Sequence, residues 1–249
     1  MNKELIKQRF KRKLISYDEN AKIQKQMAQK LIDIIALDKN LGEKEYINVL
    51  EIGCGTGLLT KITVDRLDYR NYYAIDIVDG CADYIKNINS DINFVVSDIE
   101  EYIKKDNKKY DLILSNASLQ WIDNLSDFIL ELINKLNDEG TLVFSTFGAE
   151  NFREIFYVMG KTLPYLSKQQ LYEILQEYSP YIEEEIRVMA FKTPLDVLKH
   201  ISSTGVNAIS VENWTKKDLM NFEKEYNVFC ANHPTLTYNP IYVMLNKTV

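Results

Sequence analysis

The stretch Glu51-Ile52-Gly53-Cys54-Gly55-Thr56-Gly57 decides which fold this chain adopts. A short apolar run over 46–52 leads into it and predicts a strand, and a helical apolar pattern over 58–67 follows it. Three of the nine glycines of the chain lie in this turn. Glycine adopts positive φ and lets a ligand approach the backbone, and the start of the following helix offers free N–H groups. The stretch therefore predicts a ligand-binding loop, although a tight turn without a ligand gives the same pattern.

Two kinds of cofactor-binding loop differ in the spacing of their glycines. A dinucleotide fingerprint, G-x-G-x-x-G, needs its third glycine where Leu58 stands, counting from Gly53. The spacing Glu51-x-Gly53-x-Gly55-x-Gly57 instead resembles motif I of the class I methyltransferases. In that family the acidic residue and the glycines hold the methionine and ribose portions of S-adenosylmethionine.

Acidic residues also stand at the ends of the next two predicted strands. Asp76 lies at the end of the strand expected over 72–77, where an acid binds ribose hydroxyls in Rossmann-like folds. Asp98 follows the strand expected over 93–97 and matches the methyltransferase position that meets the adenine amino group. The residues that the resemblance implies for binding the cofactor S-adenosylmethionine are Glu51, Gly53, Cys54, Gly55, Gly57, Asp76, Ile77, Asp98, Ile99 and Asn116.

The alternation of strand and helix patterns predicts an α/β fold with a Rossmann-like, mostly parallel sheet and helices on both faces. After Gly148 the pattern becomes mainly helical, with a break at Pro164. The other expected elements are a helix over 20–37, a strand over 110–115, a helix over 126–136, a strand over 141–147, helices over 150–178, a strand over 185–191, helices over 194–200 and 215–229, and a last, antiparallel strand over 236–245.

No linker rich in Gly, Pro or Ser divides the chain, so its 249 residues are expected to form a single methyltransferase domain. Its expected parts are an N-terminal helical lid (1–40), a cofactor-binding core (41–148), a helical substrate insertion over the carboxyl edge of the sheet (149–180) and the C-terminal part of the sheet (181–249).

Composition argues against several other classes of protein. The net charge of −6 is unlike that of a general nucleic-acid binder, and the charged N-terminus lacks the apolar segment of a secretory signal. No apolar run approaches the ~18–20 residues of a transmembrane helix. Three cysteines without C-x-x-C spacing and two histidines leave little material for disulfides or a metal site. We expect a cytoplasmic monomer without a metal, and with neither nucleic acid nor a membrane as its partner.

The segment after the fourth predicted strand indicates the class of substrate. Amino methyltransferases that act on adenine or glutamine carry an Asn/Asp-Pro-Pro-aromatic motif there. This chain has Ser115-Asn116-Ala117-Ser118-Leu119-Gln120-Trp121, without proline, which resembles small-molecule O-methyltransferases. Trp121 is expected to wall the methyl-transfer pocket, unless it only packs a helix.

A closer resemblance covers most of the chain. Phe10 and the run Tyr17-Asp18-Glu19-Asn20-Ala21, with Gln24, resemble the N-terminal signature of the malonyl-acyl-carrier-protein O-methyltransferases of biotin synthesis. The same family pattern recurs in Leu58-Leu59-Thr60, Ser115-Asn116, Leu119-Gln120-Trp121, Phe144-Ser145-Thr146-Phe147-Gly148, Thr204-Gly205-Val206-Asn207-Ala208 and Leu236-Thr237-Tyr238-Asn239-Pro240-Ile241-Tyr242. Two segments depart from the pattern, Asp79-Gly80-Cys81-Ala82 and Asn137-Asp138-Glu139-Gly140.

This resemblance implies methyl transfer from S-adenosylmethionine to the free carboxylate of a malonyl thioester, leaving S-adenosylhomocysteine. The thioester is malonyl-acyl carrier protein or malonyl-coenzyme A, and the methyl ester primes pimeloyl synthesis for biotin. A carboxylate with a pKa of about 4 is already an anion at neutral pH, so no general base is expected. Substrate positioning is assigned to Tyr17, Gln120, Trp121 and Arg153. Arg153 is the candidate clamp for the carboxylate, although an exposed salt bridge suits it equally.

Two alternatives remain open at this point. The chain could methylate a free small carboxylic acid, as trans-aconitate methyltransferases do, or it could bind a nucleotide without catalysis. A basic cluster near the N-terminus bears on the first alternative, because an acyl carrier protein is acidic and would dock on it. The cluster, which is otherwise a solvated helix end, consists of Lys3, Lys7, Arg9, Lys11, Arg12 and Lys13.

Overall fold

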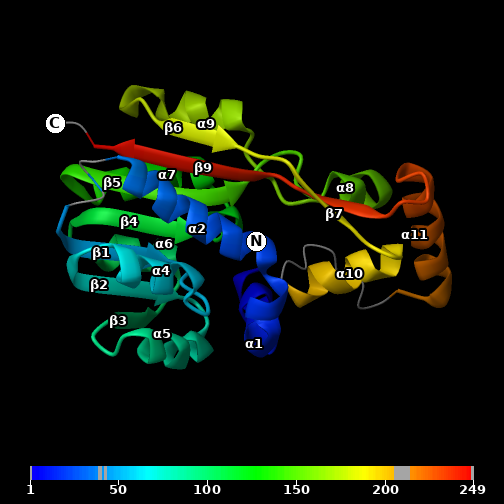
Figure 1. Ribbon diagram of the computed structural model, residues 1–249, viewed down its shortest axis with the longest axis horizontal. Coiled ribbons are helices and arrows are strands. Elements are labelled where there is room, and N and C mark those ends of the chain that lie inside the picture. Colours follow the sequence, from blue (N-terminus) through cyan, green and yellow to red (C-terminus); the bar gives the residue numbers. More distant parts are fainter. Residues whose placement is uncertain (1, 39–40, 42–43, 205–213, 248–249) are drawn as a thin grey trace.

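The computed structural model describes residues 2–38, 41, 44–204 and 214–247. Figure 1 shows a sheet flanked by helices at one end of the molecule and a smaller group of elements at the other. The family segment Thr204-Gly205-Val206-Asn207-Ala208 lies, beyond its first residue, outside the described residues. In the part of the chain that is described, no helix combines the length and the apolar content needed to cross a membrane.

The main sheet has seven strands among the described residues, in the order β3-β2-β1-β4-β5-β9-β6. Their bounds are β1 Tyr46–Ile52, β2 Tyr69–Asp76, β3 Asn93–Val96, β4 Tyr110–Asn116, β5 Leu136–Phe147, β6 Tyr181–Glu184 and β9 Pro240–Asn246. The first five strands pair in parallel, and β9 runs antiparallel to both β5 and β6. The predicted Rossmann-like sheet with an antiparallel last strand is confirmed.

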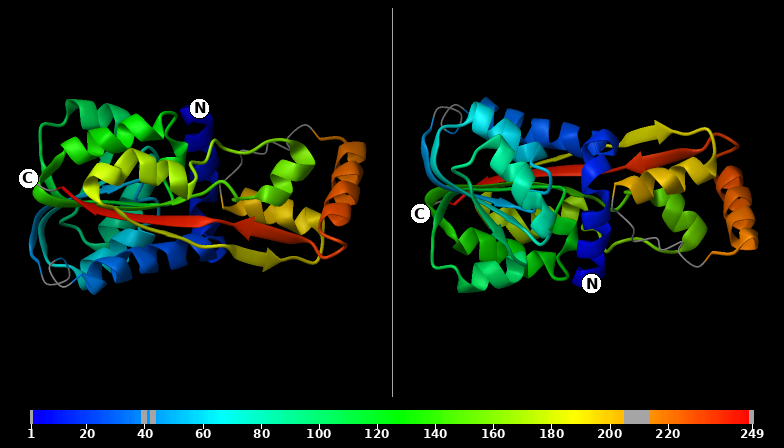
Figure 2. Two further views of the ribbon diagram at one scale, coloured as in Figure 1. Left: turned by 90° about the horizontal axis from the view of Figure 1, so that it is seen from above. Right: turned by 90° about the horizontal axis from the view of Figure 1, so that it is seen from below.

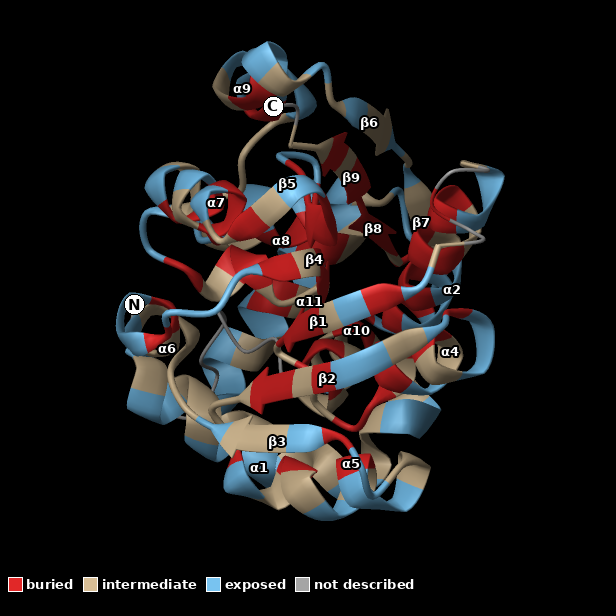
Figure 3. Ribbon diagram, turned by 90° about the vertical axis from the view of Figure 1, so that its left-hand side faces the viewer, coloured by how far each residue is buried: buried red, intermediate tan, exposed pale blue. Residues whose placement is uncertain are grey.

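Alternating side chains of the central strands build one hydrophobic core on each face of the sheet. Leu112 and Leu114 of β4 point into one core and Ile113 into the other, as the two-residue period of a strand requires. The first core is closed by α2 Lys22–Leu37, α4 Leu58–Arg66 and α5 Ala82–Ile88, and the second by α6 Ile99–Lys105, α7 Leu125–Asn134 and α9 Lys168–Leu175. Figure 3 shows the resulting burial of the central strands.

Among the described residues, the smaller group of elements contains a two-stranded antiparallel sheet and three helices. The strands are β7 Arg187–Ala190 and β8 Thr235–Tyr238, and the helices are α8 Arg153–Met159, α10 Pro194–Ser203 and α11 Lys216–Phe229. A buried carboxylate joins α8 to β8, because Glu154 accepts hydrogen bonds from the backbone N–H (2.9 Å) and the hydroxyl (2.6 Å) of Thr237. The helix α1 Lys3–Asn20 crosses the end of the main sheet between the two groups (Figure 2).

Two predicted strands differ from those in the structure, one by being shortened and the other by being divided. The strand expected over 185–191 is β7, shortened to 187–190, while residues 181–184 form the unpredicted β6. The strand expected over 236–245 breaks at Asn239 into β8 and β9. The Asn239 amide donates to the Glu185 carbonyl (3.0 Å) and the Glu184 carboxylate (3.1 Å), and Pro240 has no N–H to continue a ladder. The chain therefore passes between the main sheet and the two-stranded sheet at the same place twice, once from β6 to β7 and once from β8 to β9.

The helix expected over 126–136 also ends early. It stops at Asn134, and β5 already begins at Leu136, five residues before the predicted start at 141. No helix or strand was expected over 137–140, but these residues belong to β5, which pairs with β4 through an irregular register. Glu139 takes a positive φ of 58° and donates its N–H to Lys247, which ties this stretch to the end of the chain.

The helices of residues 149–180 lie in two different places. The first, α8, packs against α11 and β8, whereas α9 packs beside β6 at the edge of the main sheet. The division of the chain into lid, core, insertion and C-terminal part stays an interpretation.

Candidate active site

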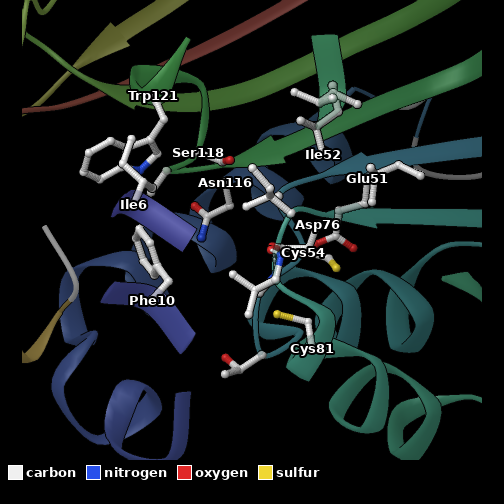
Figure 4. Close-up of a pocket in the computed structure, with 18 of the residues that line it drawn as sticks. Ile6, Phe10, Glu51, Ile52, Cys54, Asp76, Cys81, Asn116, Ser118 and Trp121 are labelled. Atoms are coloured by element: carbon white, nitrogen blue, oxygen red, sulfur yellow. Dashed lines mark hydrogen bonds between the residues drawn. The ribbon is translucent and has the colours of Figure 1, made fainter. Parts of the chain in front are cut away.

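A cavity opens at the carboxyl ends of β1, β2, β3 and β4, where ligands bind in open α/β sheets. It contains about 1100 Å³ of empty space, counting its open mouth. Most of the predicted cofactor-binding residues line it: Glu51, Gly53, Cys54, Gly55, Asp76, Ile77, Asp98, Ile99 and Asn116. Figure 4 shows Glu51, Asp76 and Asn116 approaching one another from three different strands.

The three glycines of the loop all take left-handed φ, but for different reasons. Gly55 has a φ of +54°, and a Cβ added there would meet no atom within 4 Å, because it would point into the open cavity. A Cβ on Gly53 would lie 2.0 Å from the Ser118 hydroxyl oxygen. A Cβ on Gly57 would lie 2.3 Å from Ile88 Cδ1, so Gly57 serves the packing of α4 against α5 and does not line the cavity. Gly55 alone keeps space free for a ligand.

Asp76 both shapes the loop and faces the cavity. Its carboxylate accepts hydrogen bonds from the backbone N–H groups of Gly55 (2.9 Å) and Val78 (2.8 Å). Burial raises the pKa of Asp76 even though these backbone donors favour its charged form. A hydroxyl donor from a ligand would add to the stabilisation of this carboxylate.

Glu51 is almost fully buried at the base of the cavity, with 1% of its surface exposed. One carboxylate oxygen accepts hydrogen bonds from Thr60 Oγ1 at 2.7 Å and from the Tyr72 hydroxyl at 2.5 Å. Burial raises the pKa of Glu51 to about 7, although these two hydrogen bonds oppose the shift. Near neutral pH, Glu51 is therefore poised between its neutral and its charged form.

Asp98 connects the cavity to α1. One oxygen caps α6 by accepting the Glu100 N–H at 2.9 Å, and the other lies 2.6 Å from the ammonium of Lys3. Lys3 also pairs with Glu100, and Lys11 pairs with Asp79 at 2.9 Å. Two members of the N-terminal basic cluster thus hold α1 across the mouth of the cavity.

The apolar side of α1 forms the roof of the cavity. Ile6, Phe10, Leu14 and Tyr17 line it at helical spacing. The Phe10 ring meets Trp121 edge-on, with 5.7 Å between the ring centroids, and Figure 4 shows both rings beside Ile6. No residue of α1 is fully buried, so this face remains available to a ligand. Sequence reasoning missed Lys3, Ile6 and Leu14 as lining residues, although the i, i+4 spacing of Ile6, Phe10 and Leu14 was a usable signal.

The four residues predicted to position a substrate do not all meet at this cavity. Tyr17 and Trp121 line it, and burial raises the pKa of the Tyr17 hydroxyl. Gln120 lines a smaller, adjoining cavity. Arg153 lines neither cavity; it begins α8, is half exposed and pairs with Glu150 at 3.6 Å. The geometry gives its assignment as a carboxylate clamp no support, and favours the exposed salt bridge.

Asn116 lines the cavity, but hydrogen bonds to neighbouring protein groups hold its side-chain amide. Its amide nitrogen donates to the Gln24 carbonyl at 3.0 Å, and its oxygen accepts from the Ser145 hydroxyl at 2.7 Å. These contacts join α2, β4 and β5 beside the cavity. Within the described residues, no three side chains of His, Cys, Asp and Glu gather in a way that could hold a metal ion.

Comparison with known proteins gives one matching family and many full-length relatives. A methyltransferase-domain family model matches residues 21–188. The malonyl-acyl-carrier-protein O-methyltransferase of Calditerrivibrio nitroreducens is 36% identical over 93% of this chain and 91% of its own. The protein of the same name from Bacteroides thetaiotaomicron is 32% identical and covers 99% of both chains.

Solved structures of lower sequence identity share the fold. The N-methyltransferase NodS from Bradyrhizobium japonicum, in complex with S-adenosyl-L-homocysteine, aligns with a TM-score of 0.56 at 14% identity over 97% of this chain and 98% of its own. The YcgJ protein from Bacillus subtilis aligns with a TM-score of 0.58 at 10% identity over 89% and 99% of the two chains. At such identities the likeness concerns the fold alone.

Proposed function

The chain belongs to the family of malonyl-acyl-carrier-protein O-methyltransferases, and from this premise we propose that it transfers the methyl group of S-adenosylmethionine to the free carboxylate of a malonyl thioester. The observation that carries the proposal is the cavity in which the glycine loop and three carboxylates face the apolar side of α1. The proposal includes the role of the methyl ester in priming pimeloyl synthesis for biotin, and a cytoplasmic monomer as the working form.

The residues of the cavity suit the parts of S-adenosylmethionine. The open space beside Gly55 admits the sulfonium and the ribose C5′ to which it is bonded, and the Asp76 carboxylate accepts hydrogen bonds from the ribose hydroxyls. The Asp98 carboxylate accepts a hydrogen bond from the adenine amino group, and the same carboxylate forms an ion pair with Lys3. Glu51 lies at the end of β1, where its carboxylate attracts the ammonium of the methionine portion.

The acceptor needs positioning and exclusion of water rather than a base. A malonyl carboxylate is ionised at neutral pH, since its pKa is about 4. The sulfonium supplies the methyl group: a carboxylate oxygen forms the new C–O bond while the C–S pair stays on sulfur. Phe10 and Trp121, in contact above the cavity, exclude water from the anion, which strengthens its attraction to the sulfonium. Tyr17 offers a neutral hydroxyl, and burial, which raises its pKa, favours this protonated form further.

Comparing acceptors tests the proposal against its alternatives. The ratio kcat/KM should be higher for malonyl-acyl carrier protein and malonyl-coenzyme A than for free malonate or trans-aconitate. Equal or faster methylation of the free acids would replace the proposal with a methyltransferase for small carboxylic acids. Tight cofactor binding without turnover of any acid would identify a non-catalytic binding module.

The pH dependence of cofactor binding should show whether the ionisation of Glu51 affects the affinity for S-adenosylmethionine. Its pKa of about 7 in the free protein means that a proton must leave before the carboxylate attracts the cofactor ammonium. Affinity should therefore rise with pH between about 5.5 and 7, by up to about tenfold per unit, and level off above the pKa. Calorimetric titrations of wild type and Glu51→Gln at each pH measure this, because their difference removes the titration of the cofactor itself. An identical pH profile in both proteins would exclude Glu51 from the cofactor site.

The same substitution should stabilise the protein without ligand at alkaline pH. The folded-state pKa of Glu51, about 7, lies above its ordinary value of 4.5. The neutral form of Glu51 therefore contributes its full stabilisation of the folded protein below pH 4.5. That stability is lost as pH rises through 7. Glu51→Gln stays neutral, so its melting temperature should exceed that of wild type at pH 8 and approach it at pH 5. A variant that is less stable at pH 8 would contradict this expectation.

The basic cluster divides into residues that close the cavity and residues available for docking. Lys3 forms an ion pair with Asp98 and Lys11 with Asp79. Arg12 and Lys13, in contrast, form no ion pair in the described chain. We assign Arg12 and Lys13 to the acidic carrier protein, because a net-acidic enzyme needs a local basic surface to meet it.

Substituting Arg12 and Lys13 by alanine should raise the KM for malonyl-acyl carrier protein several-fold and leave malonyl-coenzyme A nearly unaffected. The difference should fade with added salt, because exposed charges are screened within ~8–10 Å near physiological ionic strength. Lys11→Ala is the matched control: it loosens α1 and should affect both substrates alike. Steady-state kinetics at two salt concentrations measure these effects. If the double variant affects both substrates equally, the docking assignment fails.

A further inference from the structure

A second cavity adjoins the active site on the far side of the 3-10 helix η2 Leu119–Trp121. It holds about 530 Å³ of space, counting its open mouth, and Ile122 lines both cavities. Thr146 and Phe147, at the end of β5, form its buried floor, and Asp123 and Asn124 form an exposed rim. A chain-like group entering at this rim would pass η2 and reach the wall of the methyl-transfer cavity.

The side chain of Gln120 gives this cavity a chemical preference. Its amide nitrogen donates to the Ala117 carbonyl at 2.6 Å, and a carbonyl can only accept, so this contact fixes which end of the amide is oxygen. The oxygen Oε1 is buried and has no hydrogen-bond partner among the described residues. Gln120 is 7% exposed, so bulk water does not serve this oxygen freely. A buried acceptor without a partner is unfavourable, and a donor on a ligand would relieve that cost.

We propose that this second cavity binds the amide-bearing arm of the thioester, and that Gln120 Oε1 accepts a hydrogen bond from an amide N–H of that arm. The inference rests on the proposed function. An ionised malonyl group and a thioester sulfur have no hydrogen to donate, so the first donors in such a substrate are the amides of the pantetheine arm. Coenzyme A and an acyl carrier protein both present this arm. Tyr165, which accepts a hydrogen bond from Asn151 at 3.0 Å, lines the same cavity and adds a hydroxyl for the arm carbonyls.

A comparison of thioesters with and without amides tests the proposal. Malonyl-pantetheine, malonyl-coenzyme A and malonyl-acyl carrier protein carry the amides, and S-ethyl malonyl thioester does not. The ratio of kcat/KM for each amide-bearing substrate to that of the ethyl thioester should fall about 2- to 12-fold in Gln120→Leu, mainly through KM, the fold-change that one neutral hydrogen bond supplies. A drop for the carrier substrate alone would place the contact on the protein rather than on the arm, and would overturn the proposal.

Gln24→Leu is the matched control. Gln24 is also a buried glutamine whose Oε1 has no partner in the described chain, but it lies on α2 and lines neither cavity. Its substitution should leave the substrate ratio at the wild-type value. An unchanged ratio in Gln120→Leu, with normal affinity for S-adenosylmethionine as the check on folding, would overturn the proposal.

Binding of the arm alone separates this inference from the proposed function. S-methylpantetheine carries the amides but no malonyl group, and its Kd is measured by calorimetry in the presence of S-adenosylhomocysteine. Gln120→Leu should raise that Kd about 2- to 12-fold, and Gln24→Leu should not. This result would stand even if no malonyl thioester were methylated. Equal Kd values in wild type and Gln120→Leu would overturn it.

Discussion

Replacing Gly55 by valine is expected to abolish binding of S-adenosylmethionine while the protein stays folded. A Cβ at this position meets no protein atom within 4 Å and points into the cavity, so a valine side chain would fill space that we propose for the cofactor. Its φ of +54° is unfavourable for a β-branched residue, at a cost of about 1–2 kcal/mol, which a stable domain tolerates. Calorimetry measures the affinity, and circular dichroism with thermal unfolding measures the fold.

Gly160 offers a matched control for this substitution. It has a φ of +63°, it also has no atom within 4 Å of an added Cβ, and it ends α8 away from the active-site cavity. Gly160→Val should carry a similar backbone strain and keep wild-type affinity. Full affinity in Gly55→Val would mean that the loop is only a turn. Equal loss of affinity in both variants would assign the effect to strain.

Substitution of Asp76 by alanine should weaken cofactor binding about 10- to 150-fold, the equivalent of the 1.5–3 kcal/mol typical of hydrogen bonds to a charged group. The carboxylate is expected to accept the ribose hydroxyls, and it also holds the Gly55 N–H at 2.9 Å. The variant therefore loses a ligand contact and loosens the loop. Titration calorimetry of wild type and variant gives the ratio of affinities.

Asp83→Ala is the control for this second variant. Asp83 lies on α5, is exposed and does not line the cavity, so its removal changes the net charge equally without touching the site. Affinity should remain at the wild-type value. If folded Asp76→Ala also binds normally, Asp76 does not belong to the cofactor site.

The parts of the site that the sequence predicted depend on local spacing and on sheet topology. Glu51 and Asp76 stand at the ends of adjacent parallel strands, whose carboxyl ends must meet at one edge of the sheet. Their convergence beside Gly55 followed from the order of the motifs along the chain. The fold class was predictable for the same reason, since strand and helix patterns alternate regularly up to Gly148.

Other features depend on contacts between distant segments. The pairing of Lys3 with Asp98 joins residues far apart in the chain, and nothing local distinguishes Lys3 from Arg12 on the same helix. The position of Arg153 depends on how α8 packs against α11 and β8. The break at Asn239 depends on partners in the 184–185 segment. Composition and periodicity carry no information about such pairings.

The unpartnered oxygen of Gln120 could not be predicted either. The sequence placed Gln120 among the substrate-positioning residues beside Trp121, but both orientations of its amide were open. The contact with the Ala117 carbonyl selects one of them, and the end of β5 supplies the buried floor opposite.

Mass spectrometry of the acyl group measures the proposed methyl transfer to the carboxylate of a malonyl thioester. The protein is incubated with S-adenosylmethionine and either malonyl-acyl carrier protein or malonyl-coenzyme A. The acyl group should gain the mass of one CH₂ unit, as a methyl ester on its free carboxyl end, with one S-adenosylhomocysteine formed for each ester. An unmodified acyl group after incubation with a protein that binds S-adenosylmethionine would contradict the claim.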